Sequence, residues 1–117
     1  MKPHVRRAIA YIAACVISDR RSTAIYDYTS SKYYNFSINL SESGIAAYDY
    51  THNSHISGSY FSLYHYGESH HISFKIDGDR FSGFDYGTSS HFSGSVKNNS
   101  IVMYDYSVSS YFNFSIN

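Results

Sequence analysis

The residues best suited to chemistry are acids that recur in similar triplets along the chain. Five triplets are present: Tyr26-Asp27-Tyr28, Tyr48-Asp49-Tyr50, Tyr64-His65-Tyr66, Phe84-Asp85-Tyr86 and Tyr104-Asp105-Tyr106. If each triplet belongs to its own hairpin, neighbouring acids lie two strands apart, roughly 10 Å. That separation is too large for two carboxylates to share one ion or one proton. We therefore expect each Asp to accept hydrogen bonds from backbone N–H groups of its own loop.

The histidines invite a metal hypothesis, because three of them occupy the same position after a triplet. These are His55, His71 and His91, and the corresponding residues of the first and last copies are Tyr33 and Tyr111. Ligands of one zinc ion sit within about 2.1 Å of it, whereas neighbouring copies are again roughly 10 Å apart. We expect no metal site and no cofactor, and we interpret this as a position that accepts flat rings generally.

No motif of a known catalytic type interrupts the pattern. The sequence lacks Gly-x-Ser-x-Gly, His-Glu-x-x-His and a phosphate-binding glycine loop. The single cysteine, Cys15, has no partner for an intramolecular disulfide and no second Cys at metal-binding spacing, so the redox compartment stays open. We predict that the protein is not an enzyme and has no catalytic residues.

The elements that must position the triplets are β-hairpins. A four-residue polar segment follows each triplet, and after it come a ring and an alternating run such as Phe112 to Ile116. Taking that segment as the hairpin loop places the last Tyr of each triplet opposite the residue after the loop. The predicted pairs are Tyr28 with Tyr33, Tyr50 with His55, Tyr66 with His71, Tyr86 with His91, and Tyr106 with Tyr111.

The same register matches residues by size on the inner face. It sets Gly83 opposite Gly94 and Ala47 opposite Gly58, while Ile25, Leu63 and Met103 face Phe36, Phe74 and Phe114. A gap at the glycines must be filled by something bulky. We expect an N-terminal helix to lie over it.

The predicted outward face carries a row of rings, which is our candidate binding site. Its members are Tyr28, Tyr33, Tyr50, His55, Tyr66, His71, Tyr86, His91, Tyr106 and Tyr111. A second row alternates the first residue of each triplet with Asn or Ser. Two interpretations remain open: cross-strand stabilisation of a half-exposed sheet, or a binding surface of rigid amphipathic rings.

The sequence predicts a helix over residues 4–18. They are rich in Ala and follow Pro3, and the stretch from Ala8 to Ile17 is apolar on nearly every side, which is typical of a fully buried helix. Ten apolar residues are too few to span a bilayer. Alternatively, Ile12-Ala13-Ala14-Cys15 resembles the lipobox of bacterial lipoproteins, which would imply export through Cys15. We slightly favour the cytoplasm.

The length and charge of the chain bear on its domain organisation and its partners. The chain has 117 residues, which fits a single domain, and its formal net charge is zero, so we expect no nucleic-acid partner. Its first 21 residues are basic and the remainder is acidic, so the two parts should attract each other. We predict a mainly β fold: a ten-strand antiparallel meander of five β-hairpin repeats over 23–117, curled or barrel-like, wrapping one N-terminal α-helix.

Hairpins rich in Tyr and Phe, especially around Lys75-Ile76-Asp77-Gly78, resemble the cell-wall and glucan-binding repeats of bacterial surface proteins. Those repeats depend on Trp, which is absent here. The leading hypothesis is a non-catalytic binding or assembly module whose Tyr/His/Ser face contacts a protein or carbohydrate partner, or another copy of itself. The alternatives are a small-ligand carrier, with the ligand between sheet and helix, and an exported carbohydrate-binding lipoprotein.

Overall fold

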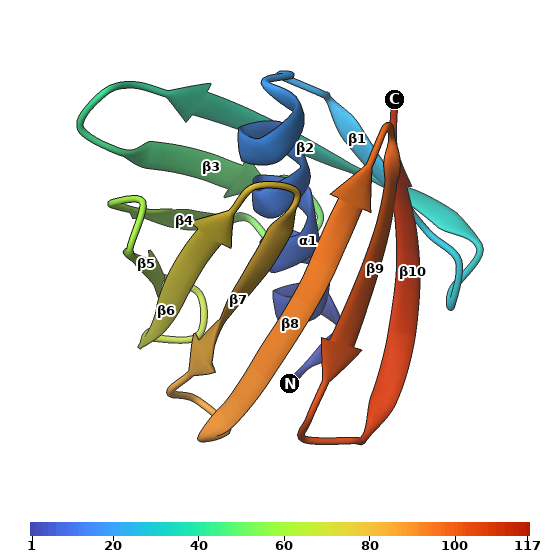
Figure 1. The fold of residues 1–117 in the computed structure, drawn as a ribbon. Helices are drawn as coiled ribbons and strands as arrows, with labels where there is room; N and C mark the ends of the chain where they lie inside the picture. The colour runs from blue at the N-terminus through green and yellow to red at the C-terminus, as the bar shows by residue number, and fades with distance from the viewer.

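A computed structural model describes residues 1–117 as a β-barrel that encloses one helix (Figure 1). The helix α1 spans Pro3–Ser18. The strands are β1 (Ala24–Asp27), β2 (Lys32–Leu40), β3 (Ile45–Asp49), β4 (Ser54–Gly58), β5 (Ser62–His65), β6 (His70–Asp77), β7 (Arg80–Asp85), β8 (Ser90–Lys97), β9 (Ser100–Asp105) and β10 (Ser110–Ile116).

The sheet is a closed antiparallel barrel in simple meander order. Every strand pairs with its neighbours in sequence, and β1 pairs with β10 to close the ring. The seam is short, with only Ile25, Tyr26 and Asp27 of β1 paired to β10. The predicted mainly β fold of ten strands and one N-terminal helix is therefore confirmed, and closure leaves no free strand edge.

Helix α1 fills the barrel. Pro3 stands in its first turn, and Asp19 ends it in the left-handed conformation with φ 54°. Residues Ala8 through Cys15 are at most 1% exposed. Because four of them are Ala, the helix is thin enough to fit inside a ring of ten strands. The prediction of a helix over 4–18 that is buried on all sides is confirmed.

The core lies between the helix and the inward-facing strand residues. Tyr11 stacks on Phe36 of β2 with ring centroids 4.6 Å apart, and its hydroxyl donates to the backbone carbonyl of Ser22. Phe81, Phe92 and Phe114 add further buried rings from three other strands. One continuous cluster of 25 buried residues results, so the helix and the barrel wall stabilise each other.

The predicted hairpin register is wrong by two residues. Tyr26 pairs with Tyr33, and the last residue of the triplet, Tyr28, lies in the loop. The other hairpins pair Tyr48 with His55, Tyr64 with His71, Phe84 with His91, and Tyr104 with Tyr111. Because side chains alternate with a period of two, a shift of two residues keeps every side chain on its predicted face.

A left-handed residue ends each of these loops. The φ angles lie between 47° and 58° at Ser31, Asn53, Ser69, Ser89 and Ser109, which are each four positions after the central residue of a triplet. This backbone turn lets the chain re-enter the sheet after a four-residue loop such as 28–31. At the opposite end of the barrel, the predicted turns at Gly78 and Asn98 are two-residue connections, and β4 and β5 are short as expected.

The predicted size matching on the inner face is also wrong. Gly83 pairs with Phe92, and Gly94 pairs with Phe81. A Cβ added at either glycine would overlap the tip of the paired Phe ring. The gaps at Gly83 and Gly94 are therefore filled by rings from the adjacent strand, whereas we had expected the helix to fill them. At Gly58 the Cβ position is occupied by the backbone around Ser62.

Candidate functional site

The outer face of the barrel carries five clusters of three aromatic rings, which we call the ring belt. In the first hairpin, the ring of Tyr26 lies edge-on between Tyr28, at 4.9 Å, and Tyr33, at 4.8 Å. The same arrangement, with centroids 4.7–4.9 Å apart, recurs in Tyr48-Tyr50-His55, Tyr64-Tyr66-His71, Phe84-Tyr86-His91 and Tyr104-Tyr106-Tyr111.

All ten residues of the predicted binding row lie on this outer face. Its seven tyrosines are between 55% and 70% exposed, and His55, His71 and His91 are exposed as well. The last Tyr of a triplet and the ring after the loop were predicted to face each other directly. Instead, the first ring of the triplet lies between them and contacts both. Those central rings, placed by the sequence in a separate row, are Tyr26, Tyr48, Tyr64, Phe84 and Tyr104.

A serine separates each cluster from the next. Across the neighbouring strand, every central ring is paired with Ser: Tyr26 with Ser115, Tyr48 with Ser37, Tyr64 with Ser57, Phe84 with Ser73, and Tyr104 with Ser93. The belt therefore alternates aromatic clusters with small hydroxyl-bearing side chains. That mixture combines apolar contact area with hydrogen-bonding groups, as binding surfaces require.

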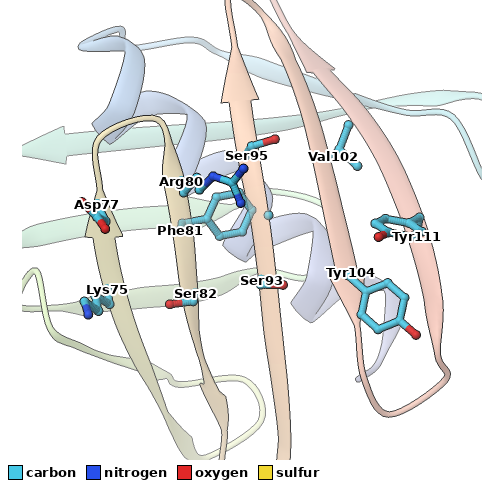
Figure 2. A pocket seen from close by; sticks show the side chains of 11 residues that line it. Lys75, Asp77, Arg80, Phe81, Ser82, Ser93, Ser95, Val102, Tyr104 and Tyr111 are labelled. Atoms are coloured by element: carbon cyan, nitrogen blue, oxygen red, sulfur yellow. The ribbon is translucent and has the colours of Figure 1, made fainter.

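The belt borders a groove on the outer face of β6 to β10 (Figure 2). Its volume is about 380 Å³. Figure 2 shows the small side chains of Ser82, Ser93 and Ser95 between Tyr104 and Tyr111 on one side and the charged residues of β6 and β7 on the other. Those charged residues are Lys75, Asp77 and Arg80, and Phe81, Gly94 and Val102 complete the lining.

The strand register explains why the groove is hollowed in the middle and walled at its sides. One row across the sheet runs Lys75, Ser82, Ser93, Tyr104, Tyr111, and the next runs Asp77, Arg80, Ser95, Val102. In both rows the residue from β8 is a serine, so the largest side chains stand on the flanking strands. None of the three charged residues is within ion-pair distance of an opposite charge.

The acids of the triplets face the barrel interior at the end where α1 begins. Each uses Oδ1 to accept a hydrogen bond from the backbone N–H two residues on: Asp27 from Thr29, Asp49 from Thr51, Asp85 from Gly87 and Asp105 from Ser107, at 2.9–3.1 Å. The prediction that each Asp fixes its own loop is therefore confirmed.

Two of these acids also pair with cations at the start of the helix. Arg7 lies 3.3 Å from Asp27, and Arg6 lies 3.2 Å from Asp105, which also meets the amino group of Met1 at 3.3 Å. Burial alone would raise the pKa of Asp105, but hydrogen bonds from Ser107 and the charged amino group hold it below its usual value. The predicted attraction between the basic first 21 residues and the acidic remainder of the chain is provided by these buried ion pairs.

His65 replaces the acid in the third hairpin and anchors a cluster of histidines. Its Nδ1 accepts the N–H of Glu68 at 3.2 Å, while Nε2 is buried without a partner. The ring of His4 packs edge-on against His65 at 5.6 Å and stacks on His52 at 4.1 Å. Burial, followed by repulsion from His4, lowers the pKa of His65 to about 4.

The remaining reactive groups form no further site. No group of three or more His, Cys, Asp and Glu is arranged to hold a metal ion. Cys15 is a free thiol inside the barrel, and burial raises its pKa. The structure contains no helix with the length and apolarity needed to cross a membrane.

No protein-family model, curated protein or solved structure matches this chain.

Proposed function

We propose that the protein is a non-catalytic binding module whose ring belt and adjoining groove contact a carbohydrate. The observation that carries this proposal is the exposure of the belt. Its ten outer rings stand at the surface as five similar clusters, while the carboxylates of the triplets face inward and accept hydrogen bonds from their own loops.

Tyrosine suits such a surface physically. Its ring offers a large, rigid contact area at low entropic cost, and its hydroxyl can donate to and accept from a polar ligand. Edge-on packing holds each ring against a neighbour and limits the freedom that binding would otherwise remove. Sugars present both apolar C–H faces and hydroxyl groups, so a surface of rings and serines matches their chemistry.

The interior is less suited to a ligand than the outer face. The helix lies where a small-ligand carrier would hold its cargo, and it is packed on Tyr11, Phe36 and other buried side chains. The lipoprotein alternative is also disfavoured, because cleavage before Cys15 would remove the residues from Ala8 to Ala14 that fill the barrel. These two observations favour a binding role for the outer face.

A glycan array probed with the intact protein tests the proposal. We expect binding to a restricted set of oligosaccharides, and we expect the variants Tyr86→Ser and Tyr111→Ser to weaken that binding about tenfold or more, as the loss of buried aromatic contacts commonly does. Phe61→Ser is the matched control, because Phe61 is a 78% exposed ring in the turn between β4 and β5 that belongs to no cluster.

Two results would refute carbohydrate binding. One is the absence of any glycan above background; the other is equal binding by wild type and both Tyr variants. Sedimentation of the same samples then examines a second role of the surface: dimers that dissociate in Tyr50→Ser would identify another copy of the chain as the partner of the belt.

A further inference from the structure

We propose that the groove over β6 to β10 is the ligand site and that its ligand is an acidic oligosaccharide, with a uronic-acid carboxylate on Arg80 and a sugar ring against Tyr111. This inference rests on the proposed carbohydrate function and adds to it a location and a charge class. It starts from a part of the belt where a hollow of about 380 Å³ adjoins two rings and three charged side chains.

The size of the groove suits a short saccharide. Sites for small molecules commonly measure about 300–1,000 Å³, and the groove lies within that range. Its length follows the sheet across five strands, from Lys75 on β6 to Tyr111 on β10. A rigid chain of two or three sugars placed along that row would contact the rings at one end and the cations at the other.

The cations are free to bind a ligand. Arg80 and Lys75 are exposed, and neither forms an ion pair or a side-chain hydrogen bond within the protein. Arg80 extends over the floor toward Ser95 in Figure 2, whereas Asp77 stands on β6 at the margin. A guanidinium presents parallel N–H donors that match a carboxylate, so an acidic group is favoured over a neutral one.

The positive charge of Lys75 occurs in only one of the hairpins. Counting from the ring after each loop, the position of Lys75 is taken by Ser37, Ser95 and Ser115 in other hairpins. The belt elsewhere offers the same rings with no cation at this position. An acidic sugar should therefore select this groove among the otherwise similar clusters.

The floor supplies the remaining contacts. Ser82 and Ser93 are directly paired across β7 and β8, and Ser95 follows two residues later on the same face. Their hydroxyls can donate or accept, and so can match the hydroxyl groups of a sugar ring. The wall at Tyr104 and Tyr111 is fixed by their edge-on contact at 4.7 Å, so the aromatic side of the site is already in place before binding.

The test is calorimetric titration of the intact protein with trigalacturonate, with its methyl ester and with a neutral hexose trimer. The ester removes the charge of each carboxylate and adds only a methyl group to it. We expect the acid to bind at least about tenfold more tightly than the ester, since hydrogen bonds to charged groups contribute that much. Added salt should reduce this preference.

Variants locate the site and provide the matched control. Arg80→Gln and Tyr111→Ser should each weaken trigalacturonate binding about tenfold, with a smaller loss for Lys75→Gln. Lys97→Gln should have no effect, because Lys97 is an exposed lysine of the same sheet that does not line the groove. Thermal unfolding of each variant checks that the barrel is intact.

The possible outcomes distinguish a failure of the acidic-ligand inference from a failure of the proposed carbohydrate function. Equal affinity for the acid and the ester, or unchanged binding by Arg80→Gln, would overturn the acidic-ligand inference. Tyr-dependent binding of the neutral trimer alone would do the same and leave the carbohydrate function standing. If none of the three probes binds and the glycan array is also empty, both proposals fail.

Discussion

At the scale of single residues, one of the five triplets departs from the pattern at its central position and introduces a buried group that titrates. His65 stands where the other hairpins have Asp, and it keeps the role of loop acceptor through Nδ1 only while its ring is neutral. Protonation would place a hydrogen on that nitrogen and break the contact with Glu68. His4, His70, Glu68 and Asp49 are the charged or titratable groups that face it.

We predict that acidification destabilises the protein through His65. Its pKa is about 4 in the folded state against 6.5 in the unfolded chain, so the unfolded state takes up the proton first. Stability is full above pH 6.5, falls as the pH drops toward 4, and then levels off for this group. Linkage gives a loss of about 2 kcal/mol between pH 7 and pH 5. Urea unfolding at the two pH values measures it.

His65→Asn is the informative variant for this prediction. The amide oxygen of Asn can accept the Glu68 N–H in the same way as the acids of the other loops, and it does not titrate. The variant should lose most of the pH dependence in this window. His71→Asn, on the outer face of the adjacent strand, should retain it; equal slopes for His65→Asn and wild type would contradict the assignment.

A second prediction concerns the buried ion pairs. Asp27→Asn keeps an oxygen for the Thr29 N–H but leaves Arg7 buried without a counter-charge. Removing one partner of a buried pair costs roughly 3 kcal/mol or more. Asp49→Asn is isosteric and faces no arginine, so we expect it to cost less than half as much in denaturant unfolding. Similar losses for both variants would show that the Arg7 pair contributes little.

At the scale of elements, the face of the sheet that each side chain occupies was easier to predict than the residue it pairs with across the hairpin. Even spacing between triplets fixed which face each side chain occupies, so the inward Asp and outward Tyr residues were assigned correctly. The loop was placed one residue late, which shifts the pairing by two, because the triplet's final Tyr looks like a strand residue while Tyr28 and its equivalents actually begin the loop. The size matching of Gly83 with Gly94 agreed with that wrong register by coincidence.

A third prediction concerns β7 and β8, where each strand places a glycine opposite a phenylalanine of the other. At Gly94 an added Cβ would overlap both the Phe81 ring and the backbone carbonyl of Val102. Because backbone atoms cannot move aside cheaply, Gly94→Ala should destabilise the fold by about 3 kcal/mol. Gly78→Ala is the control: it lies in open space at φ 62° and should cost only about 1 kcal/mol. Thermal unfolding distinguishes the two.

Contacts between distant elements were the part that local patterns could not provide. His4 and His52 come from the helix and from a hairpin loop, and they meet only because the barrel closes around α1. The groove likewise depends on five strands lying side by side, while its serines are common residues throughout the sequence. The basic composition of the first 21 residues was the one long-range signal, and it correctly indicated attraction to the acidic remainder.

At the scale of the whole molecule, the barrel encloses a helix that shares one buried core with the inward faces of the strands. We predict that a fragment of residues 22–117 does not unfold cooperatively, because the inward faces of the strands would have no helix to pack against. Adding a synthetic peptide of residues 1–21 should restore a cooperative transition, seen by circular dichroism. A fragment that unfolds cooperatively by itself would show that the strands can collapse into a core of their own.

The seam between β1 and β10 gives the fold an order of assembly. A helix with its side chains is about 10 Å across and cannot enter a ring whose strands are already joined. The three residues of β1 that pair with β10 therefore act as a latch that closes the ring around the helix.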